Sequence, residues 1–237
     1  MKRDQLLQAL FAGSWQPTQA NDNFFVGSGR VGEQTVQVIG TDNAIEVGVD
    51  LALAMARAVL DTLRTHPGRA ILFLLDTQGQ RLRRRDELLG LNGYMAHLAK
   101  CVEIARGRGH RILSLVYGQA VSGGYLTTGM MADACYALAD AEIKVMNLPA
   151  MARITKIPQE RLEALARQSP VFSPGVLNYQ RMGHLQALWS GDLAACLQRA
   201  LVEVQQAPPG DRRMALGLAR GGRQSAQAVA ERVCGHV

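Results

Sequence analysis

The stretch GQAVSGGYLTTG, residues 118–129, follows directly on the apolar run ILSLVY. We expect a strand at the apolar run, then a turn of small residues, then a short helix that ends near residue 132. Gly123 and Gly124 let the backbone turn sharply and bring its N–H groups close to a ligand. Ser122 is suited to be a helix cap or a nucleophile. The turn therefore fits three uses: a phosphate cradle, a serine hydrolase or an oxyanion hole.

Strand and helix patterns alternate on both sides of this turn. The predicted strands are two around a glycine turn at 24–39 and further ones at 70–75, 112–117, 135–138 and 143–146, with helices at 48–64 and 86–106. The run AILFLL at 70–75 is typical of a strand covered on both faces, and Asp76–Gly79 ends it. Beyond Pro149 the pattern is helical, with helices that begin near 157 and 173 and two more at 192–205 and 211–234. The sequence predicts one α/β domain over 1–237, with a core at about 24–150 and a helical C-terminal region at about 151–237.

A formal GxGxxG motif at Gly27, Gly29 and Gly32 is rejected as a dinucleotide fingerprint. Such a motif has to open a helix, whereas here a strand pattern with alternating Val36 and Val38 follows. We expect a hairpin turn.

Composition excludes several classes of protein. With 48% hydrophobic and 19% charged residues, the chain is a globular protein rather than a disordered one. No stretch of about 18 apolar residues predicts a membrane span, and the polar N-terminal segment does not resemble a signal peptide, so we expect a cytoplasmic protein. The four cysteines and five histidines show no metal-ligand spacing, and no metal site is expected.

The net charge is +6, and positive charge is concentrated at 106–111 and in two further arginine clusters. One contains Arg81, Arg83, Arg84 and Arg85, and the other contains Arg212, Arg213, Arg220 and Arg223. Each is either a solvated face or a docking surface for an anionic partner. Nucleic acid is disfavoured because no recognition motif is present, which leaves a phosphorylated cofactor arm or an acidic carrier protein.

Two motifs resemble the crotonase superfamily, and within it the acyl-CoA carboxyltransferase domains. Asp76-Thr77-Gln78-Gly79 resembles the Asp-Thr-Pro-Gly of the first oxyanion loop, and residues 118–125 resemble the glycine-rich second loop, with the strand region at 130–146 after it. The whole chain is similar to the gamma-subunit family of biotin-independent malonate decarboxylases, through SPGVLNYQRMGHLQALWSGDL at 173–193 and DRRMALGLARGGR at 211–223. The resemblance implies the ClpP/crotonase fold, a spiral of ββα units.

The resemblance also implies a reaction, partners and site residues. A beta subunit and this chain would decarboxylate a malonyl thioester carried on the phosphopantetheine-type group of an acyl carrier protein, which an alpha subunit loads, with no cofactor bound directly. Two backbone N–H groups would stabilise the enolate oxygen, at about 3–4 kcal/mol each. Gly123 would be a donor and Gly124 would shape the turn, with Gly79 and Ser122 in the substrate loop and Arg81, Arg83, Arg84 and Arg85 docking the carrier.

Departures from the family pattern keep an alternative open. Gln80-Arg81-Leu82-Arg83 stands where the first loop continues Phe-x-Pro-Gly, and Leu126 stands where enoyl-CoA hydratases have a glutamate. The chain could therefore be a scaffold for its partner's active site, with Gly123 and Gly124 present for tight packing.

A serine peptidase of the Clp type is the remaining reading. Ser122 falls on the nucleophile of those peptidases, but Asn147 stands where they have the histidine base. We therefore expect Ser122 to be a helix cap or a turn former.

Overall fold

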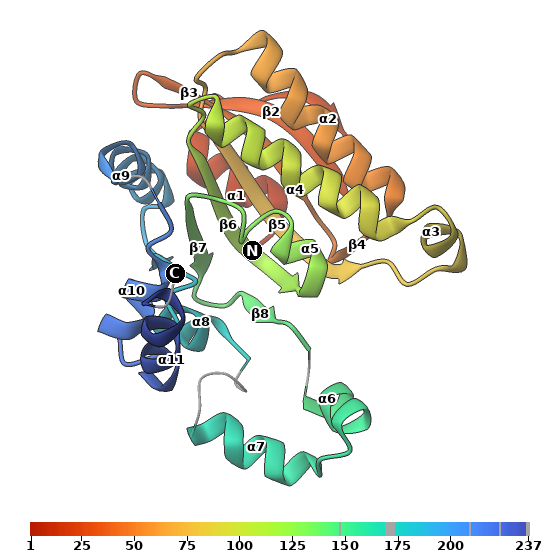
Figure 1. Cartoon of the computed structure of the whole chain (residues 1–237). Coiled ribbons are helices and arrows are strands. Elements are labelled where there is room, and N and C mark those ends of the chain that lie inside the picture. The colour runs from red at the N-terminus through yellow and green to blue at the C-terminus, as the bar shows by residue number, and fades with distance from the viewer. Residues whose placement is uncertain (147, 169–173, 209, 223, 236–237) are drawn as a thin grey trace.

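The computed structural model describes residues 1–146, 148–168, 174–208, 210–222 and 224–235, and it shows a single mixed sheet with helices on both faces (Figure 1). Within these residues the strand order is β1-β2-β3-β5-β6-β7-β9, with β4 on β5 and β8 on β6. The strands are β1 (Gln16–Ala20), β2 (Phe24–Val31), β3 (Gln34–Thr41), β4 (Ile45–Val47), β5 (Ile71–Gln80), β6 (Ile112–Val121), β7 (Ala134–Leu138), β8 (Glu142–Lys144) and β9 (Ala187–Trp189).

The glycine-rich N-terminal motif forms a hairpin, as predicted. Strands β2 and β3 pair antiparallel, and Gly32, with φ +58°, lies in the turn between them. The other two glycines make room for aromatic rings. A Cβ on Gly29 would lie 2.3 Å from Phe11 Cδ1, and one on Gly27 would lie 2.5 Å from the Trp15 ring. Phe11 ends α1 (Arg3–Phe11), a helix that the sequence analysis did not predict.

The parallel strands β5 and β6 form the buried centre of the sheet. Both run further than predicted, to Gln80 and Val121. Asp76–Gly79 therefore does not end its strand, because β4 pairs with the far half of β5 and β8 pairs with the far half of β6. Each extended strand thus pairs with three other strands, and its polar end remains hydrogen-bonded.

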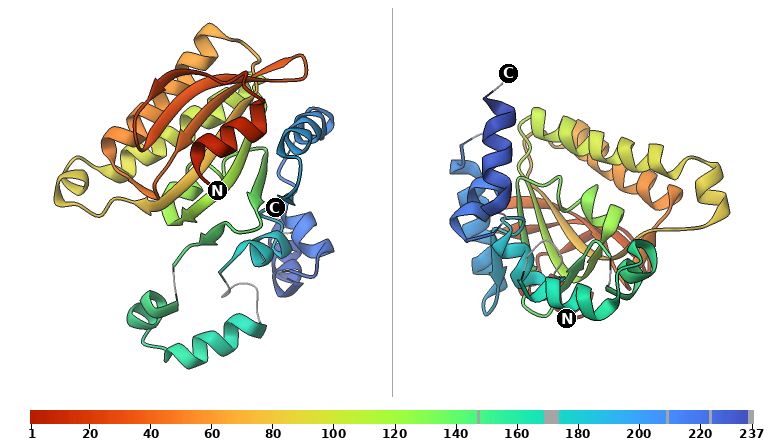
Figure 2. Two further views of the ribbon diagram at one scale, coloured as in Figure 1. Left: turned by 180° about the vertical axis from the view of Figure 1, so that it is seen from behind. Right: turned by 60° about the horizontal axis from the view of Figure 1, so that its bottom comes forward.

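Two long helices cover one face of the sheet. Helix α2 (Val49–Thr65) and helix α4 (Leu91–Gly107) lie side by side over it, whereas α1 packs on the opposite face (Figures 1 and 2). The helix predicted at 86–106 is broken at Gly90, with φ +75°, so that α3 (Arg84–Leu88) is separate. The helix predicted after the GQAVSGGYLTTG turn is also shorter than expected, because α5 (Ser122–Leu126) ends in a series of turns.

The C-terminal region is mostly helical but also contributes a strand. Its helices are α6 (Leu148–Thr155), α7 (Gln159–Gln168), α8 (Val176–Arg181), α9 (Leu193–Gln206), α10 (Arg213–Ala219) and α11 (Gln224–Cys234). Strand β9 pairs with β7, so this region completes the sheet. The helix predicted at 211–234 is two helices, and Gly221, with φ +73°, lies between them. Ser173, near the predicted start of another helix, lies outside the described residues.

Helices α6 and α7 lie apart from the sheet and its covering helices (Figure 1). In the described part of the chain, no helix combines the length and hydropathy needed to cross a membrane. No cluster of His, Cys, Asp or Glu among these residues could hold a metal ion.

Candidate oxyanion site at the ends of β5 and β6

The two motifs singled out in the sequence meet in space. Gly79, with φ +98°, lies against the β6–α5 turn, and a Cβ on it would be 2.9 Å from Val121 O and 3.3 Å from Ser122 Cβ. The Gly79 N–H donates to Thr77 Oγ1 at 3.1 Å, and that hydroxyl donates to Ile45 O at 2.6 Å. The N–H of Gly79 is thus bonded within the loop, and glycine is required there for conformation and close packing.

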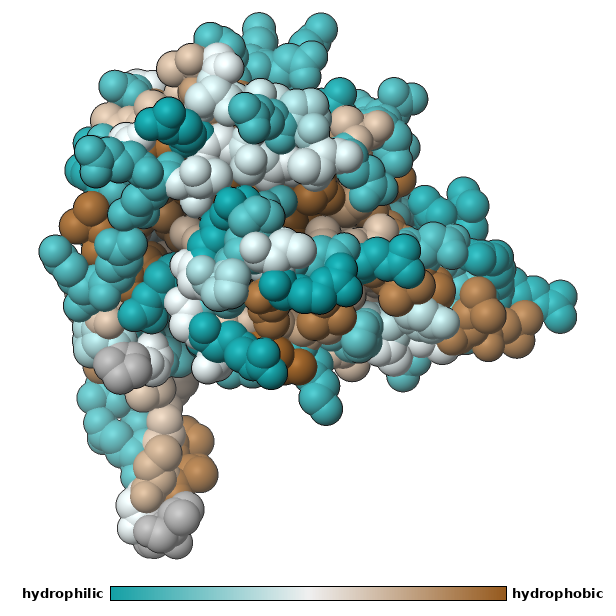
Figure 3. Space-filling model, turned by 90° about the horizontal axis from the view of Figure 1, so that it is seen from above, coloured by the Kyte–Doolittle hydropathy of each residue, from teal (hydrophilic) through white to brown (hydrophobic). Residues whose placement is uncertain are grey.

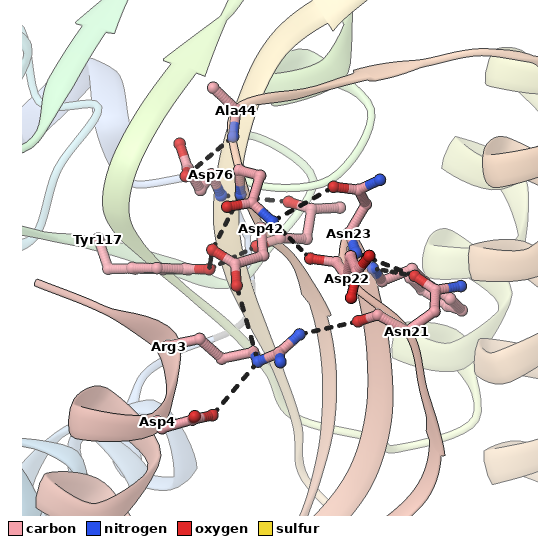
Figure 4. Close-up of polar contacts among 12 residues, drawn as sticks. Arg3, Asp4, Asn21, Asp22, Asn23, Asp42, Ala44, Asp76 and Tyr117 are labelled. Carbon is pink, nitrogen blue, oxygen red and sulfur yellow. Dashed lines mark hydrogen bonds and ion pairs between the residues drawn. The ribbon is translucent and has the colours of Figure 1, made fainter.

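Asp76 fixes the strand geometry behind these loops (Figure 4). Its Oδ1 accepts a hydrogen bond from Gln119 N at 2.7 Å, and its Oδ2 accepts one from Ala44 N at 3.0 Å. Opposite Asp76 the pairing register shifts, because Leu75 pairs with Val116 whereas Thr77 pairs with Ala120. This carboxylate therefore stabilises a bulge in β6, and its two oxygens are already used by backbone donors.

A second polar group extends from this bulge to the N-terminal helix (Figure 4). The Tyr117 hydroxyl donates to Thr41 O at 2.7 Å and to Asp42 Oδ1 at 3.0 Å, and Asp42 forms an ion pair with Arg3 at 3.6 Å. Burial, and then the Asp42 carboxylate, raises the pKa of Tyr117 well above its ordinary value. These groups hold α1 against the sheet.

Gly123, the predicted oxyanion donor, already has an oxygen in front of it. Its N–H donates to Oε1 of Gln80 at 3.1 Å. A Cβ on Gly123 would lie 3.0 Å from the same Oε1 and 3.1 Å from Met95 Cε. Gly123 is absent from the residues with positive φ, so no backbone conformation requires a glycine here. What glycine provides is space for Gln80 and Met95 above the N–H.

Gly124 has a packing role. A Cβ on this residue would lie 3.0 Å from both Gly79 Cα and Thr77 Oγ1, and 3.2 Å from Val47 Cγ2. The close approach of α5 to β5 therefore depends on Gly124.

Of the two structural roles expected for Ser122, the structure supports the turn former and not the helix cap. The N-cap of α5 is Val121, which has no side-chain cap hydrogen bond, and Ser122 itself is held at φ +46°. Across the residues that the structure describes, the Ser122 hydroxyl makes no hydrogen bond to a histidine. Asn147, where a peptidase would have its base, lies outside them. Leu126, at the hydratase glutamate position, is 46% exposed.

Two arginines of the first cluster form ion pairs, and two do not. Arg85 donates two hydrogen bonds to Asp50, at 2.7 and 3.2 Å, and Arg81 lies 3.9 Å from Glu46. The hydrogen bond from Arg85 lowers the pKa of Asp50. Arg83 and Arg84 are exposed and have no ion pair with any described residue. They are the two arginines of this cluster that remain available to a partner.

The second cluster is largely structural, because two of its members are bonded within the chain. Arg220 donates to three backbone carbonyls, those of Gln180, Leu185 and Gln186. Arg213 forms an ion pair with Asp211 and donates to Met130 O at 2.6 Å. Arg212 and Arg213 line a cavity of about 390 Å³, and Arg223 lies outside the described residues.

Sequence reasoning missed the two side chains that cover the turn. In the sequence Gln80 stands out only as a departure from a family motif, and no pattern marks Met95. They contact Gly123 only because β5, α4 and α5 pack together in the fold. Gln80 is 43 residues from Gly123 in the sequence. A small apolar cluster of Val49, Leu91 and Met95 supports this side of the site.

The fold and the two adjoining turns define a carboxyltransferase-like member of the crotonase superfamily. The transcarboxylase 12S structure has the same fold, with a TM-score of 0.72 at 17% identity over 89% of this chain and 44% of that chain. The chain belongs to the malonate decarboxylase gamma-subunit family, whose profile matches residues 42–236. This confirms the family resemblance drawn from the sequence.

Individual relatives agree with this assignment. The malonyl-S-ACP:biotin-protein carboxyltransferase MADD of Malonomonas rubra is 28% identical over 89% of this chain and 82% of its own length. A Pseudomonas malonate decarboxylase hetero-tetramer in complex with coenzyme A contains a chain that is 28% identical, with a TM-score of 0.78 and 97% of both chains covered. The Pseudomonas MdcD–MdcE hetero-dimer gives a TM-score of 0.77 at 27% identity, covering 100% of this chain and 99% of that chain.

Proposed function

We propose that this chain pairs with a beta-type subunit and that the two together decarboxylate a malonyl thioester to an acetyl thioester and CO2. The C–C bond to the carboxylate breaks, its electron pair forms an enolate with charge on the thioester oxygen, and a proton adds to carbon. The reaction class is that of a carboxy-lyase. Family membership over residues 42–236 supports this proposal, and the similar Pseudomonas chains come from a hetero-dimer and a hetero-tetramer.

The observation that carries the proposal is the Gln80 oxygen 3.1 Å from the Gly123 N–H. An oxyanion donor has to lie about 2.7–3.1 Å from the oxygen that it stabilises. The turn thus holds a backbone donor at the required distance from a carbonyl-type oxygen. We propose that Gly123 and Gly124 form the oxyanion turn and that Gly79 and Ser122 form the adjacent part of the substrate loop.

The same contact favours a second candidate function. With the Gly123 N–H bonded to Gln80 and the Gly79 N–H bonded to Thr77, both expected donors are satisfied within the chain. A subunit in that state would act as a scaffold that shapes the active site of its beta partner. Activity measurements on the assembled complex separate the two functions.

The remaining components follow from the proposed reaction. An acyl carrier protein would present the substrate on a phosphopantetheine-type group, an alpha subunit would load it, and this chain would bind no cofactor directly, all in the cytoplasm. The exposed Arg83 and Arg84 suit an acidic carrier. Leu82 and Leu88, near them in the sequence, are also exposed, and hydrophobic and hydrophilic residues lie next to one another at this protruding end of the molecule (Figure 3).

The test is Gly123→Val in a complex co-expressed with the beta-type subunit. The new side chain would displace Gln80 and Met95 and cover the N–H, because even a Cβ lies within 3.1 Å of both. We expect decarboxylation to fall by about 10²–10³-fold, the range for loss of one oxyanion donor. Ser122→Ala is the matched control, with most activity retained. An assembled Gly123→Val complex with full activity would favour the scaffold function.

A further inference from the structure

We infer that the carboxamide of Gln80 is itself an oxyanion donor, with its Nε2 amino group presented to the thioester oxygen. This inference rests on the proposed function and assigns a catalytic residue within it. The Gly123 N–H would then bind the Gln80 carbonyl oxygen, and the Nε2 group of the same side chain would contact the substrate oxygen. The first oxyanion loop departs from the family sequence at this position. The Gly79 N–H is bonded to Thr77, and Gln80 would supply the hydrogen-bond donor that this N–H does not.

Hydrogen-bond chemistry fixes the orientation of the amide. A backbone N–H can only donate, so the Gln80 atom 3.1 Å from Gly123 N has to be the carbonyl oxygen. The NH2 group at the other end of the same planar amide then points away from Gly123. No described residue accepts a hydrogen bond from Nε2, and the Gln80 side chain is partly exposed. Both N–H bonds of this group are therefore free for a ligand.

The backbone under Gln80 is held on both sides. Gln80 is paired with Val47 of β4, and the next residue, Arg81, donates its N–H to Val47 O at 2.9 Å. Gly79, immediately before it, packs against Ser122. A donor on a fixed strand end, with its amide oriented by a second hydrogen bond, needs little reorganisation when charge develops on a substrate oxygen.

Accepting the Gly123 bond also makes the amide a better donor. Chains of hydrogen bonds polarise one another, so the N–H groups of an amide strengthen as donors when its oxygen accepts a bond. The buried side chain of Met95 lies over the same turn, which limits the access of water to it. Both effects increase the stabilisation of an enolate oxygen placed against Nε2.

The opposite role for the same contact is a plug, in which Gln80 occupies the position that the substrate oxygen needs. The two roles predict opposite effects of removing the side chain. Gln80→Ala frees the Gly123 N–H, so that a plug gives equal or higher activity, whereas a donor gives lower activity. Gln80→Leu fills the space without any donor or acceptor.

The experiment measures kcat and KM of the complex with the beta-type subunit, using the malonyl thioester of the carrier protein. For Gln80→Leu and Gln80→Ala we expect kcat to fall by about 10²-fold with KM little changed, since the lost contact forms in the transition state. Gln16→Leu, an exposed strand glutamine at the sheet edge, is the matched control and should match wild type. Size-exclusion chromatography and melting temperature establish that each variant assembles.

The outcomes separate the inference from the proposed function. A wild-type complex that does not decarboxylate the thioester overturns both. An active wild-type complex, together with Gln80→Ala at wild-type or higher kcat, overturns the inference and identifies Gln80 as a plug or a bystander. Lower kcat in both variants supports the donor role, because a plug cannot produce it.

Discussion

The carboxylate of Asp76 occupies the space that a side chain on Gly118 would need. A Cβ on Gly118 would lie 2.4 Å from both Cγ and Oδ1 of Asp76. Because Asp76 also accepts hydrogen bonds from Gln119 N and Ala44 N, it cannot move aside without losing them. The small residue that opens the GQAVSGGYLTTG stretch is thus explained by a side chain on the neighbouring strand.

Gly118→Ala should therefore destabilise the protein. Overpacking costs about 1–3 kcal/mol, and displacement of the Asp76 carboxylate adds the loss of its hydrogen bonds. Urea unfolding of the isolated chain would measure the change. Gly93→Ala is the matched control, since a Cβ there meets nothing within 4 Å and a helical alanine is favoured by up to about 1 kcal/mol. Equal stabilities for the two variants would contradict the steric explanation.

Ser122→Gly should stabilise the protein. Ser122 has φ +46°, in the left-handed region that costs a non-glycine residue about 1–2 kcal/mol. Part of the gain is offset by the greater freedom of glycine in the unfolded chain, so we expect a net increase of about 0.5–1 kcal/mol. Differential scanning calorimetry should show a melting temperature higher by about 1–4 °C. Ser122→Ala keeps the strain and should leave the temperature near that of wild type; a similar rise in both variants would argue against strain.

The central elements could be predicted from the sequence because their signals are local. The apolar runs at 70–75 and 112–117 identify buried strands, and the glycine turn after the second identifies the candidate site. The ends of these strands could not be predicted in the same way. Asp76 and Gln80 are polar and are typical of a loop. The strand β4, which pairs with residues 77–80 of β5, has three residues, too few to show a periodicity.

The arginine clusters and the cover over Gly123 show the same limit. Arg83 and Arg220 both belong to arginine clusters in the sequence. In the structure Arg83 is exposed, whereas Arg220 donates hydrogen bonds to three backbone carbonyls. Whether a charge is a docking group or a structural one depends on which backbone lies within its reach after folding. The hydrogen bond from Gly123 to Gln80 likewise forms only when the ends of β5 and β6 lie side by side in the folded chain.

Arg220→Met should destabilise the C-terminal region. The guanidinium donates to Gln180 O at 2.9 Å, Leu185 O at 2.7 Å and Gln186 O at 2.8 Å, and methionine would leave these carbonyls without their charged donor. Hydrogen bonds to charged groups contribute about 1.5–3 kcal/mol each, and allowing for water we expect a total loss of about 2–4 kcal/mol. Urea unfolding measures it. Arg57→Met, at an exposed position on α2, should change stability by less than about 0.5 kcal/mol; comparable losses would show that Arg220 has no clamping role.

The buried thiol of Cys135 should make stability fall at alkaline pH. Burial raises the pKa of Cys135 from 9.0 to about 11. Between these values the unfolded chain releases the proton and the folded chain keeps it, so this contribution is fully present below pH 9 and is lost as pH rises toward 11. Its slope is at most about 1.4 kcal/mol per pH unit. Urea unfolding at several pH values should show a shallower decline for Cys135→Ala than for wild type; parallel declines would rule out this thiol as the cause.

Reversing Arg83 and Arg84 should weaken docking of the carrier without affecting the chemistry. Both side chains are exposed and have no ion pair among the described residues, so replacing them with glutamate changes the surface charge and breaks no such ion pair. Exposed charges act mainly on the association rate, and we expect the KM for the carrier to rise about 3- to 10-fold at low salt with kcat unchanged. The difference should disappear near 1 M salt, where screening acts over about 3 Å. The matched control reverses Lys100, exposed on α4, and Arg108, exposed at the C-cap of that helix. An equal rise there would indicate a general charge effect, and an unchanged KM in the Arg83/Arg84 variant would make that cluster a solvated face.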